Sequence, residues 1–269
     1  LGRLTIETPK TVVNLQLEDN LWRVMEIGNY YAGYRQINNL FNDFADARIY
    51  RRRGPATDAD EKKFGLDDNA FRVITRDAGG RILNTVLIGK AAADNLYHFA
   101  RIEGEKDVFL ITGNFSFPET AVSWLQQPLL SLSPADIRSL KIGQETAVRP
   151  DIIVPFRIKG KQAVPDISRY LNALGFVAAY DVRRSADFDR LQFSAPKSLT
   201  VTTFDGLVVT IEVYGRTGEE YWASFKFSTT TLPTTAVNDY IKSSAFLYED
   251  WYFRLAPDVG RILFNAFIQ

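Results

Sequence analysis

The chain carries few residue types that could perform chemistry. It has no cysteine, and His98 is its single histidine. Thiol catalysis, thiolate metal ligation and disulfides are therefore excluded, and a catalytic triad or a histidine zinc site would depend on His98 alone. His98 lies in the alternating segment 97–101, which is typical of a strand, and the sequence identifies no acid–base partner for it. We expect a structural or surface histidine and no enzymatic activity.

A short acidic segment raises the question of a calcium site. Residues 58–61 read Asp-Ala-Asp-Glu, and two more aspartates stand at 67–68. Lys62 and Lys63, however, occupy the positions where an EF-hand loop needs an oxygen ligand and a glycine. Carboxylates in the first turn of a helix interact favourably with the helix dipole. The segment therefore predicts the start of a helix, and we expect neither a metal nor a cofactor.

Four aromatic residues are candidates for a ligand or partner surface. They are Trp22, Tyr30, Tyr31 and Tyr34. Such rings could form a stacking platform for a sugar, although aromatic side chains more often fill the core between helix and sheet.

The second candidate surface is basic. It is the one concentrated basic run of the sequence, formed by Arg48, Arg51, Arg52 and Arg53. They could contact lipid head groups, phosphate or an acidic partner. Alternatively, they lie at the carbonyl end of a helix, where cations are favoured, and Arg-Arg at 183–184 follows the second predicted helix in a similar place.

The overall composition is that of a soluble globular protein. Hydrophobic residues make up 46% of the chain and charged residues 24%. Lys plus Arg equals Asp plus Glu, 32 against 32, so no net field attracts nucleic acid, and we expect no nucleic-acid partner. No run approaches the roughly 20 apolar residues that span a bilayer. Because the chain opens at Leu1 beside a predicted strand, we expect the natural protein to continue upstream.

The hydrophobic pattern predicts an α+β fold. Ile37, Leu40, Phe41 and Phe44 recur at helical spacing, and a helix over this region should end near Ile49. Later segments alternate in hydrophobicity and are separated by turn residues, which is typical of an antiparallel meander. The same succession of a helix and a meander occurs again in the second half of the chain.

An internal duplication explains this repetition. Corresponding residues lie 126 to 130 positions apart: Ile37 with Ile167, Asn42 with Asn172, Asp77 with Asp205, Gly89 with Gly215, and Trp124 with Trp251. We therefore predict two similar units, residues 1–145 and 146–269, each a mostly antiparallel sheet with an amphipathic helix packed on one face. The segment 143–155, which contains two prolines, is the predicted linker.

Several aromatic and glycine landmarks resemble a known bacterial family. They are Trp22-Arg23-Val24, Tyr30-Tyr31-Ala32, Phe64-Gly65-Leu66, Leu87-Ile88-Gly89, Tyr97 with Arg101, Trp124 with Leu129-Leu130, Phe204-Asp205-Gly206-Leu207 and Tyr221-Trp222. Their order is similar to the family of domains of unknown function numbered forty-three forty. The resemblance implies an extracytoplasmic or periplasmic domain, tethered to the inner membrane by an N-terminal helix outside this chain. No catalytic or ligand-binding residues are carried over from it.

The resemblance also implies a function. Members of the family are often encoded beside an ABC transporter and a gliding-motility-type auxiliary subunit, which are therefore the expected partners. We expect a non-enzymatic accessory or scaffold domain of an ABC-type transport or motility-associated complex, acting through protein contacts. The alternative is a carbohydrate- or lipid-binding module that uses exposed aromatic residues.

Overall fold

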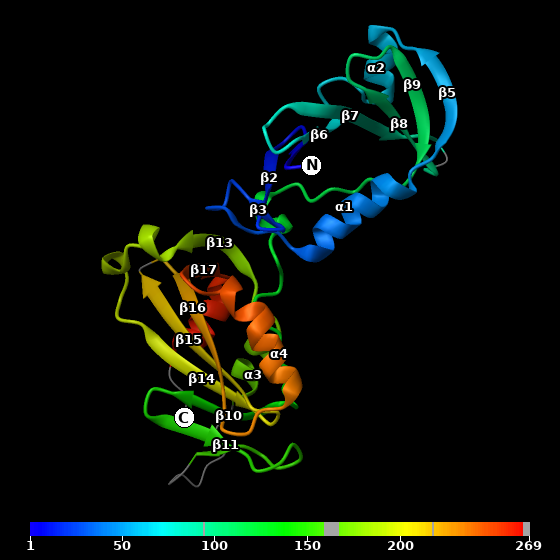
Figure 1. Cartoon of the computed structure of the whole chain (residues 1–269). Helices are drawn as coiled ribbons and strands as arrows, with labels where there is room; N and C mark the ends of the chain where they lie inside the picture. The colour runs from blue at the N-terminus through cyan, green and yellow to red at the C-terminus, as the bar shows by residue number, and fades with distance from the viewer. Residues whose placement is uncertain (94, 159–166, 217, 266–269) are drawn as a thin grey trace. The chain divides into compact units, whose positions relative to one another are not determined.

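A computed structural model describes residues 1–93, 95–158, 167–216 and 218–265. The chain divides into two compact units, unit 1 (Leu1–Gln126) and unit 2 (Gln127–Gln269). Each unit is built around one antiparallel sheet, of nine strands in unit 1 and eight in unit 2, with helices beside it (Figure 1). The α+β class predicted from the sequence is confirmed. No helix in the described residues is long and apolar enough to cross a membrane.

Unit 1 begins with a meander and ends with a second one. Its elements are β1 (Arg3–Glu7), β2 (Val12–Glu18), β3 (Leu21–Val24), β4 (Tyr30–Tyr31), α1 (Tyr34–Asp46), β5 (Ile49–Pro55), α2 (Asp58–Phe64), β6 (Phe71–Arg76), β7 (Ile82–Ala91), β8 (Tyr97–Ile102), β9 (Asp107–Thr112) and the 3-10 helix η1 (Ala121–Trp124). The strand order is β4-β3-β2-β1-β6-β7-β8-β9-β5. The strand β5 thus forms one edge of the sheet, although it precedes four of its strands in the sequence.

Unit 2 contains two helices, Thr235–Ser244 and Pro257–Phe264, that have no counterpart among the described residues of unit 1. Its elements are β10 (Ile137–Ile142), β11 (Glu145–Val148), β12 (Arg157–Ile158), α3 (Ser168–Gly175), β13 (Ala179–Arg184), η2 (Ser185–Asp187), η3 (Arg190–Gln192), β14 (Lys197–Thr203), β15 (Leu207–Arg216), β16 (Glu220–Thr229), α4 (Thr235–Ser244), η4 (Ala245–Leu247), β17 (Trp251–Leu255) and α5 (Pro257–Phe264). The strand order is β12-β11-β10-β14-β15-β16-β17-β13. The helix α5 lies against α3 and against β14, β15 and β16.

The two sheets have the same strand order once β4 is set aside. In both, a meander of three strands lies next to four further strands in sequence order. The strand that follows the first helix then pairs outside the last of these four, as β5 does with β9 and β13 with β17. Asp77 and Asp205 lie in the turns of the equivalent hairpins β6–β7 and β14–β15. The shared topology supports the duplication that the residue offsets predict.

One of the predicted pairs is not equivalent in the structure. Trp124 lies in η1, outside the sheet, whereas Trp251 opens β17, whose counterpart is β9. Unit 2 has α4 and η4 between its last two strands, where unit 1 has only residues 103–106. The insertion increases the sequence offset between equivalent residues from that point onward. The offset of this pair therefore agrees with the other offsets only by chance.

The boundary between the units also differs from the predicted one. The division falls between Gln126 and Gln127, whereas the sequence places it between residues 145 and 146. The predicted linker begins with β11, which pairs with β10 from Glu145 to Val148 and with β12 at Ala147 and Val148. Two prolines and small residues suggest a linker, but long-range pairing makes part of the segment a strand.

The segment that follows the edge strand packs an aromatic side chain onto the sheet in both units. In unit 1, Phe64 at the end of α2 packs with Leu87 and Val108. In unit 2, Phe188 packs with Trp222 and Tyr252, together with Tyr214. The equivalent connections therefore fill equivalent parts of the two cores.

Candidate functional site

The four aromatic candidates do not form one exposed platform. Tyr30 is 1% exposed, and its ring packs edge-on against Tyr31 at 5.4 Å between centroids. The guanidinium carbon of Arg23 lies 4.5 Å from the Tyr31 ring centre. Trp22 is half-buried beside Phe41. Only Tyr34, at 76% exposure, presents its ring to solvent, and a single ring does not make a stacking platform.

The arginine candidates lie on a strand and not at a helix end. The helix α1 ends at Asp46, and all three arginines belong to the edge strand β5. The helix-terminus interpretation is therefore wrong for Arg51, Arg52 and Arg53. It is correct for Arg48, whose Nη1 donates to the carbonyl oxygens of Ala45 (2.7 Å) and Ala47 (2.8 Å).

The acidic segment forms the helix start that its sequence predicts. Thr57 and Asp60 make a reciprocal capping box at the N-terminus of α2, and Gly65 ends the helix with φ of +68°. The hydrogen bonds from Thr57 lower the pKa of the Asp60 carboxyl. Within the described ranges, no group of three or more His, Asp and Glu residues could hold a metal ion.

His98 is packed among neutral groups. Its ring meets Phe115 edge-on at 5.6 Å, and its Nδ1 lies 3.4 Å from the carbonyl oxygen of Gly89. The contacts are those of a structural side chain, as the sequence predicts.

An exposed tyrosine occupies the same position of the edge strand in both units. In β5 the pairing with β9 shifts between Ile49 and Arg51, so that Tyr50 is the extra residue of a β-bulge. In β13 the pairing with β17 shifts between Ala179 and Asp181, which makes Tyr180 the extra residue there. Tyr50 is 60% exposed and Tyr180 is 58% exposed. We call these two residues the bulge tyrosines.

Specific contacts hold each bulge in place. The ring of Tyr50 stacks on that of Tyr97, at 4.1 Å and 16° between the planes. Before the first bulge, the Arg48 backbone exchanges hydrogen bonds with Thr112. At the second, the side chain of Gln127 brackets Ala179, accepting from its N–H (3.1 Å) and donating to its carbonyl oxygen (2.9 Å). The tyrosines are therefore displayed from fixed backbone.

Arginines accompany both bulge tyrosines. Arg52 pairs with Asp107, and the Arg53 guanidinium lies 5.9 Å from the Phe64 ring centre. In the part of unit 1 that the structure describes, Arg51 is exposed and has no ion pair. In β13, Arg183 and Arg184 stack over tryptophan rings of unit 2. Each edge strand therefore presents tyrosine and arginine together.

The sequence contains a signal that would have identified the bulge tyrosines. Tyr50 and Tyr180 are 130 residues apart (180 − 50), the same offset as Ile37 and Ile167. Extending the alignment of the two halves through the strands would have paired them. The bulge itself could not be predicted, because it depends on pairing with a strand that lies far away in the sequence.

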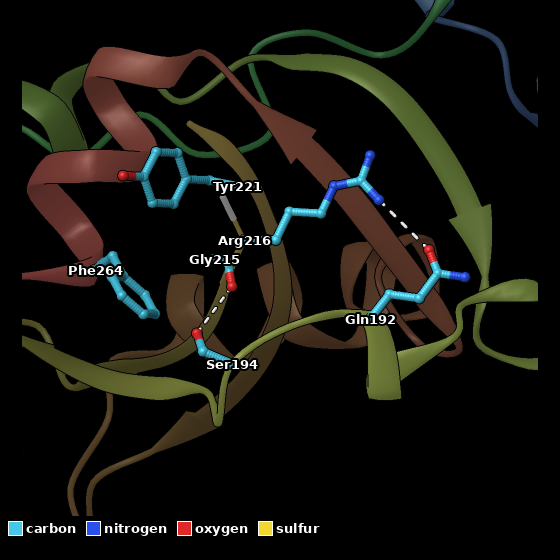
Figure 2. Close-up of a pocket in the computed structure, with 6 residues that line it drawn as sticks. All are labelled: Gln192, Ser194, Gly215, Arg216, Tyr221 and Phe264. Atoms are coloured by element: carbon cyan, nitrogen blue, oxygen red, sulfur yellow. Dashed lines mark hydrogen bonds between the residues drawn. The ribbon is translucent and has the colours of Figure 1, made fainter. Parts of the chain in front are cut away.

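A pocket of about 330 Å³ lies beside the end of β15 in unit 2. Figure 2 shows the rings of Tyr221 and Phe264 on one side of Gly215, with Arg216 and Gln192 on the other. Arg216 pairs with Glu220 and donates to Gln192, and the Ser194 hydroxyl donates to the Gly215 carbonyl oxygen at 2.8 Å. These polar groups satisfy one another, so they brace the end of the strand.

Glu220 makes the stability of unit 2 depend on pH. Burial alone would raise its pKa, but hydrogen bonds from the Trp222 indole and from Arg216 together lower the pKa of this carboxyl below its ordinary 4.5. Such a group stabilises the fold above its ordinary pKa, and this contribution is lost as the pH falls through the lowered value. We expect Glu220→Gln to cost about 1.5–3 kcal/mol at neutral pH and progressively less below about pH 4.

Denaturant unfolding of both proteins from pH 7 to pH 3 measures this effect. Glu249→Gln, a change at an exposed carboxylate in the same unit, is the matched control. A difference between Glu220→Gln and the unmodified chain that stays constant over the whole range would contradict the expectation.

The comparisons with known proteins identify one family. Residues 22–196 match the model described as Domain of unknown function (DUF4340). The match covers well over half of the chain and extends across the boundary between the units. Neither a curated protein nor a solved structure matches the chain.

Proposed function

The chain belongs to the DUF4340 family of domains of unknown function, and we propose that it is a non-enzymatic accessory or scaffold domain that acts through its bulge tyrosines. Its proposed setting is outside the cytoplasm, in an ABC-type transport or motility-associated membrane complex. Contact with the membrane would be through an N-terminal tether. The partners would be transporter and auxiliary subunits of that complex.

The duplicated bulge is the observation that carries this proposal. A bulge aims a side chain away from the regular sheet and is typically a designed feature of a fold. Tyrosine and arginine are among the residue types that contribute most to protein interfaces. Both bulge tyrosines are largely exposed, so the core does not account for their presence. Two equivalent surfaces of this kind suit a scaffold that binds proteins.

Other features are compatible with this setting. The absence of cysteine suits an oxidising compartment, where a free thiol is a liability. The residue landmarks that resemble the family favour the same location. We also propose that an amphipathic helix packs on one face of each sheet, α1 in unit 1 and α3 together with α5 in unit 2.

Replacing both bulge tyrosines with alanine should weaken partner binding. Loss of an interface tyrosine typically costs about 2 kcal/mol, which corresponds to roughly a thirtyfold loss of affinity for each site that is engaged. We expect the full-length Tyr50→Ala, Tyr180→Ala protein, solubilised from membranes, to recover at least about tenfold less of the transporter subunits than the unmodified protein.

A matched control is available in the same chain. Tyr34→Ala removes a tyrosine that is even more exposed but does not lie on an edge strand, and it should leave recovery unchanged. If the unmodified full-length protein is repeatedly recovered alone, the accessory function is wrong. If transporter subunits are recovered equally well with all the variants, the assignment of the contact to the bulge tyrosines is wrong.

A further inference from the structure

The last two strands of the two units are connected differently. In unit 1, β8 and β9 are joined by residues 103–106 and pair at four positions, from Tyr97 with Thr112 to Ala100 with Phe109. In unit 2, residues 230–250 intervene, including α4 and η4 (Figure 1). There β16 and β17 pair only at Trp222 with Arg254 and Ala223 with Phe253. The insertion therefore accompanies a separation of two neighbouring strands.

A cleft of about 400 Å³ opens where β16 and β17 separate. Its lining comes from β16 between Ser224 and Phe227, from η4 and the turn at 248–250, and from the start of β17. The Ser185 N–H donates to the Asp250 carbonyl oxygen at 2.7 Å, which fixes β13 to the end of the inserted segment. We call this space the insertion cleft. Its volume lies within the range of known ligand sites.

One wall of the insertion cleft is an open strand edge. From Ser224 to Thr229, β16 pairs with β15 on one side. On the other side, no strand within the described residues pairs with this stretch. Backbone N–H and C=O groups on such an edge can hydrogen-bond to an added strand.

The side chains of the cleft divide into an apolar floor and a charged rim. Phe225 is buried, and the ring of Phe227 lies 4.6 Å from that of Tyr248. On the rim, Lys226 is exposed on the β16 side, and Glu249 and Asp250 are exposed on the opposite side. The cleft thus offers an aromatic surface between one positive and two negative charges.

We propose that the insertion cleft binds an extended peptide segment of a partner protein as an added strand beside Ser224–Phe227. The open edge would supply backbone hydrogen bonds, and the aromatic floor would take an apolar side chain of the peptide. Charge complementarity requires a basic peptide residue facing Glu249 and Asp250, and an acidic residue facing Lys226. This inference deepens the proposed function, because it names the form in which a partner is recognised.

The test uses the purified chain and an array of short synthetic peptides with varied charge patterns. We expect bound peptides to combine an apolar residue with an acidic and a basic residue. At saturation, hydrogen exchange of those amides in Ser224–Thr229 that lack a strand partner should slow by about tenfold or more. Absence of binding across the array, or binding without protection of this stretch, would overturn the proposal.

Charge exchange across the cleft provides the matched variants. Lys226→Glu combined with Glu249→Lys and Asp250→Asn exchanges the signs of the net charges of the two sides and should reverse the preferred order of charges in the bound peptides. Lys242→Glu changes an exposed lysine on α4 outside the cleft and should leave the preference unchanged. An unchanged preference in the triple variant would also overturn the proposal. Since no membrane partner is needed, this result is independent of the recovery experiment on the bulge tyrosines.

Discussion

Replacing Trp222 with alanine is expected to lower the free energy of unfolding of unit 2 by about 3–5 kcal/mol. The Trp222 side chain is fully buried, and it packs with Phe188 at 5.5 Å between ring centroids. The Arg183 guanidinium carbon lies 4.7 Å from its ring centre, and its indole nitrogen donates to Glu220 at 2.7 Å. Alanine would leave a cavity and remove all three contacts. Chemical denaturation followed by circular dichroism measures the loss.

A second tryptophan serves as the control. Trp22 is only half-buried and packs beside Phe41, so Trp22→Ala should cost less than Trp222→Ala. Trp222→Phe keeps an aromatic ring and should recover part of the stability. If Trp222→Ala unfolds at the same denaturant concentration as the unmodified chain, the central place of this ring in the core of unit 2 is disproved.

The second large loss of stability is expected when Arg149 is replaced. This residue is only 8% exposed. Its guanidinium donates to four carbonyl oxygens, those of Pro134, Ala135, Ile137 and Ile152. It also lies 4.6 Å from the ring centre of Phe156. Burial lowers the pKa of Arg149, and the nearby Asp151 partly opposes this effect. The side chain therefore ties the backbone at and before the start of β10 to the backbone that follows β11.

Arg149→Met should destabilise the chain by about 3 kcal/mol, because methionine fills the space and leaves buried carbonyl oxygens without a donor. Lysine retains the charge but not the planar group of donors, so the stability of Arg149→Lys should lie between those of Arg149→Met and the unmodified chain. Arg138→Met, at an exposed position of β10, should change stability by less than about 0.5 kcal/mol. Equal stability of the two methionine variants in thermal unfolding would refute the bracing role of Arg149.

Sequence patterns correctly predict those elements that are stabilised by interactions between residues close together in the sequence. The helical spacing of Ile37, Leu40 and Phe44 matches α1, and the acidic segment matches α2 with its capping box. Hairpin turns follow Asp77 and Asp205 as their turn residues predict. In these cases the decisive interactions join residues that are close in the sequence.

The features that the sequence does not reveal depend on distant pairing. The segment Ile49–Pro55 contains three consecutive arginines followed by Gly-Pro, which is typical of a break after a helix. It becomes a strand because it pairs with β9, from Ile49 with Ile111 to Pro55 with Asp107. The same reason explains the misplaced unit boundary at β11 and the unforeseen bulges. The candidate surface on β5 was therefore identified by its arginines but not by Tyr50.

The bulged edge strands β5 and β13 also affect how the chain behaves beside copies of itself. A long regular edge strand exposes a row of unpaired backbone groups that recruits strands from other molecules and leads to aggregation. Here the sheet of unit 1 ends on one side in β4, a strand of only two residues, and each sheet ends on the other side in a bulged strand with arginines, β5 or β13. Two residues are too few to template a partner, and a bulge interrupts the regular spacing that a new strand would need. At these protected edges, neighbouring copies therefore find no regular strand to pair with, and the stretch Ser224–Thr229 of β16, unpaired on one side among the described residues, is left for the proposed peptide.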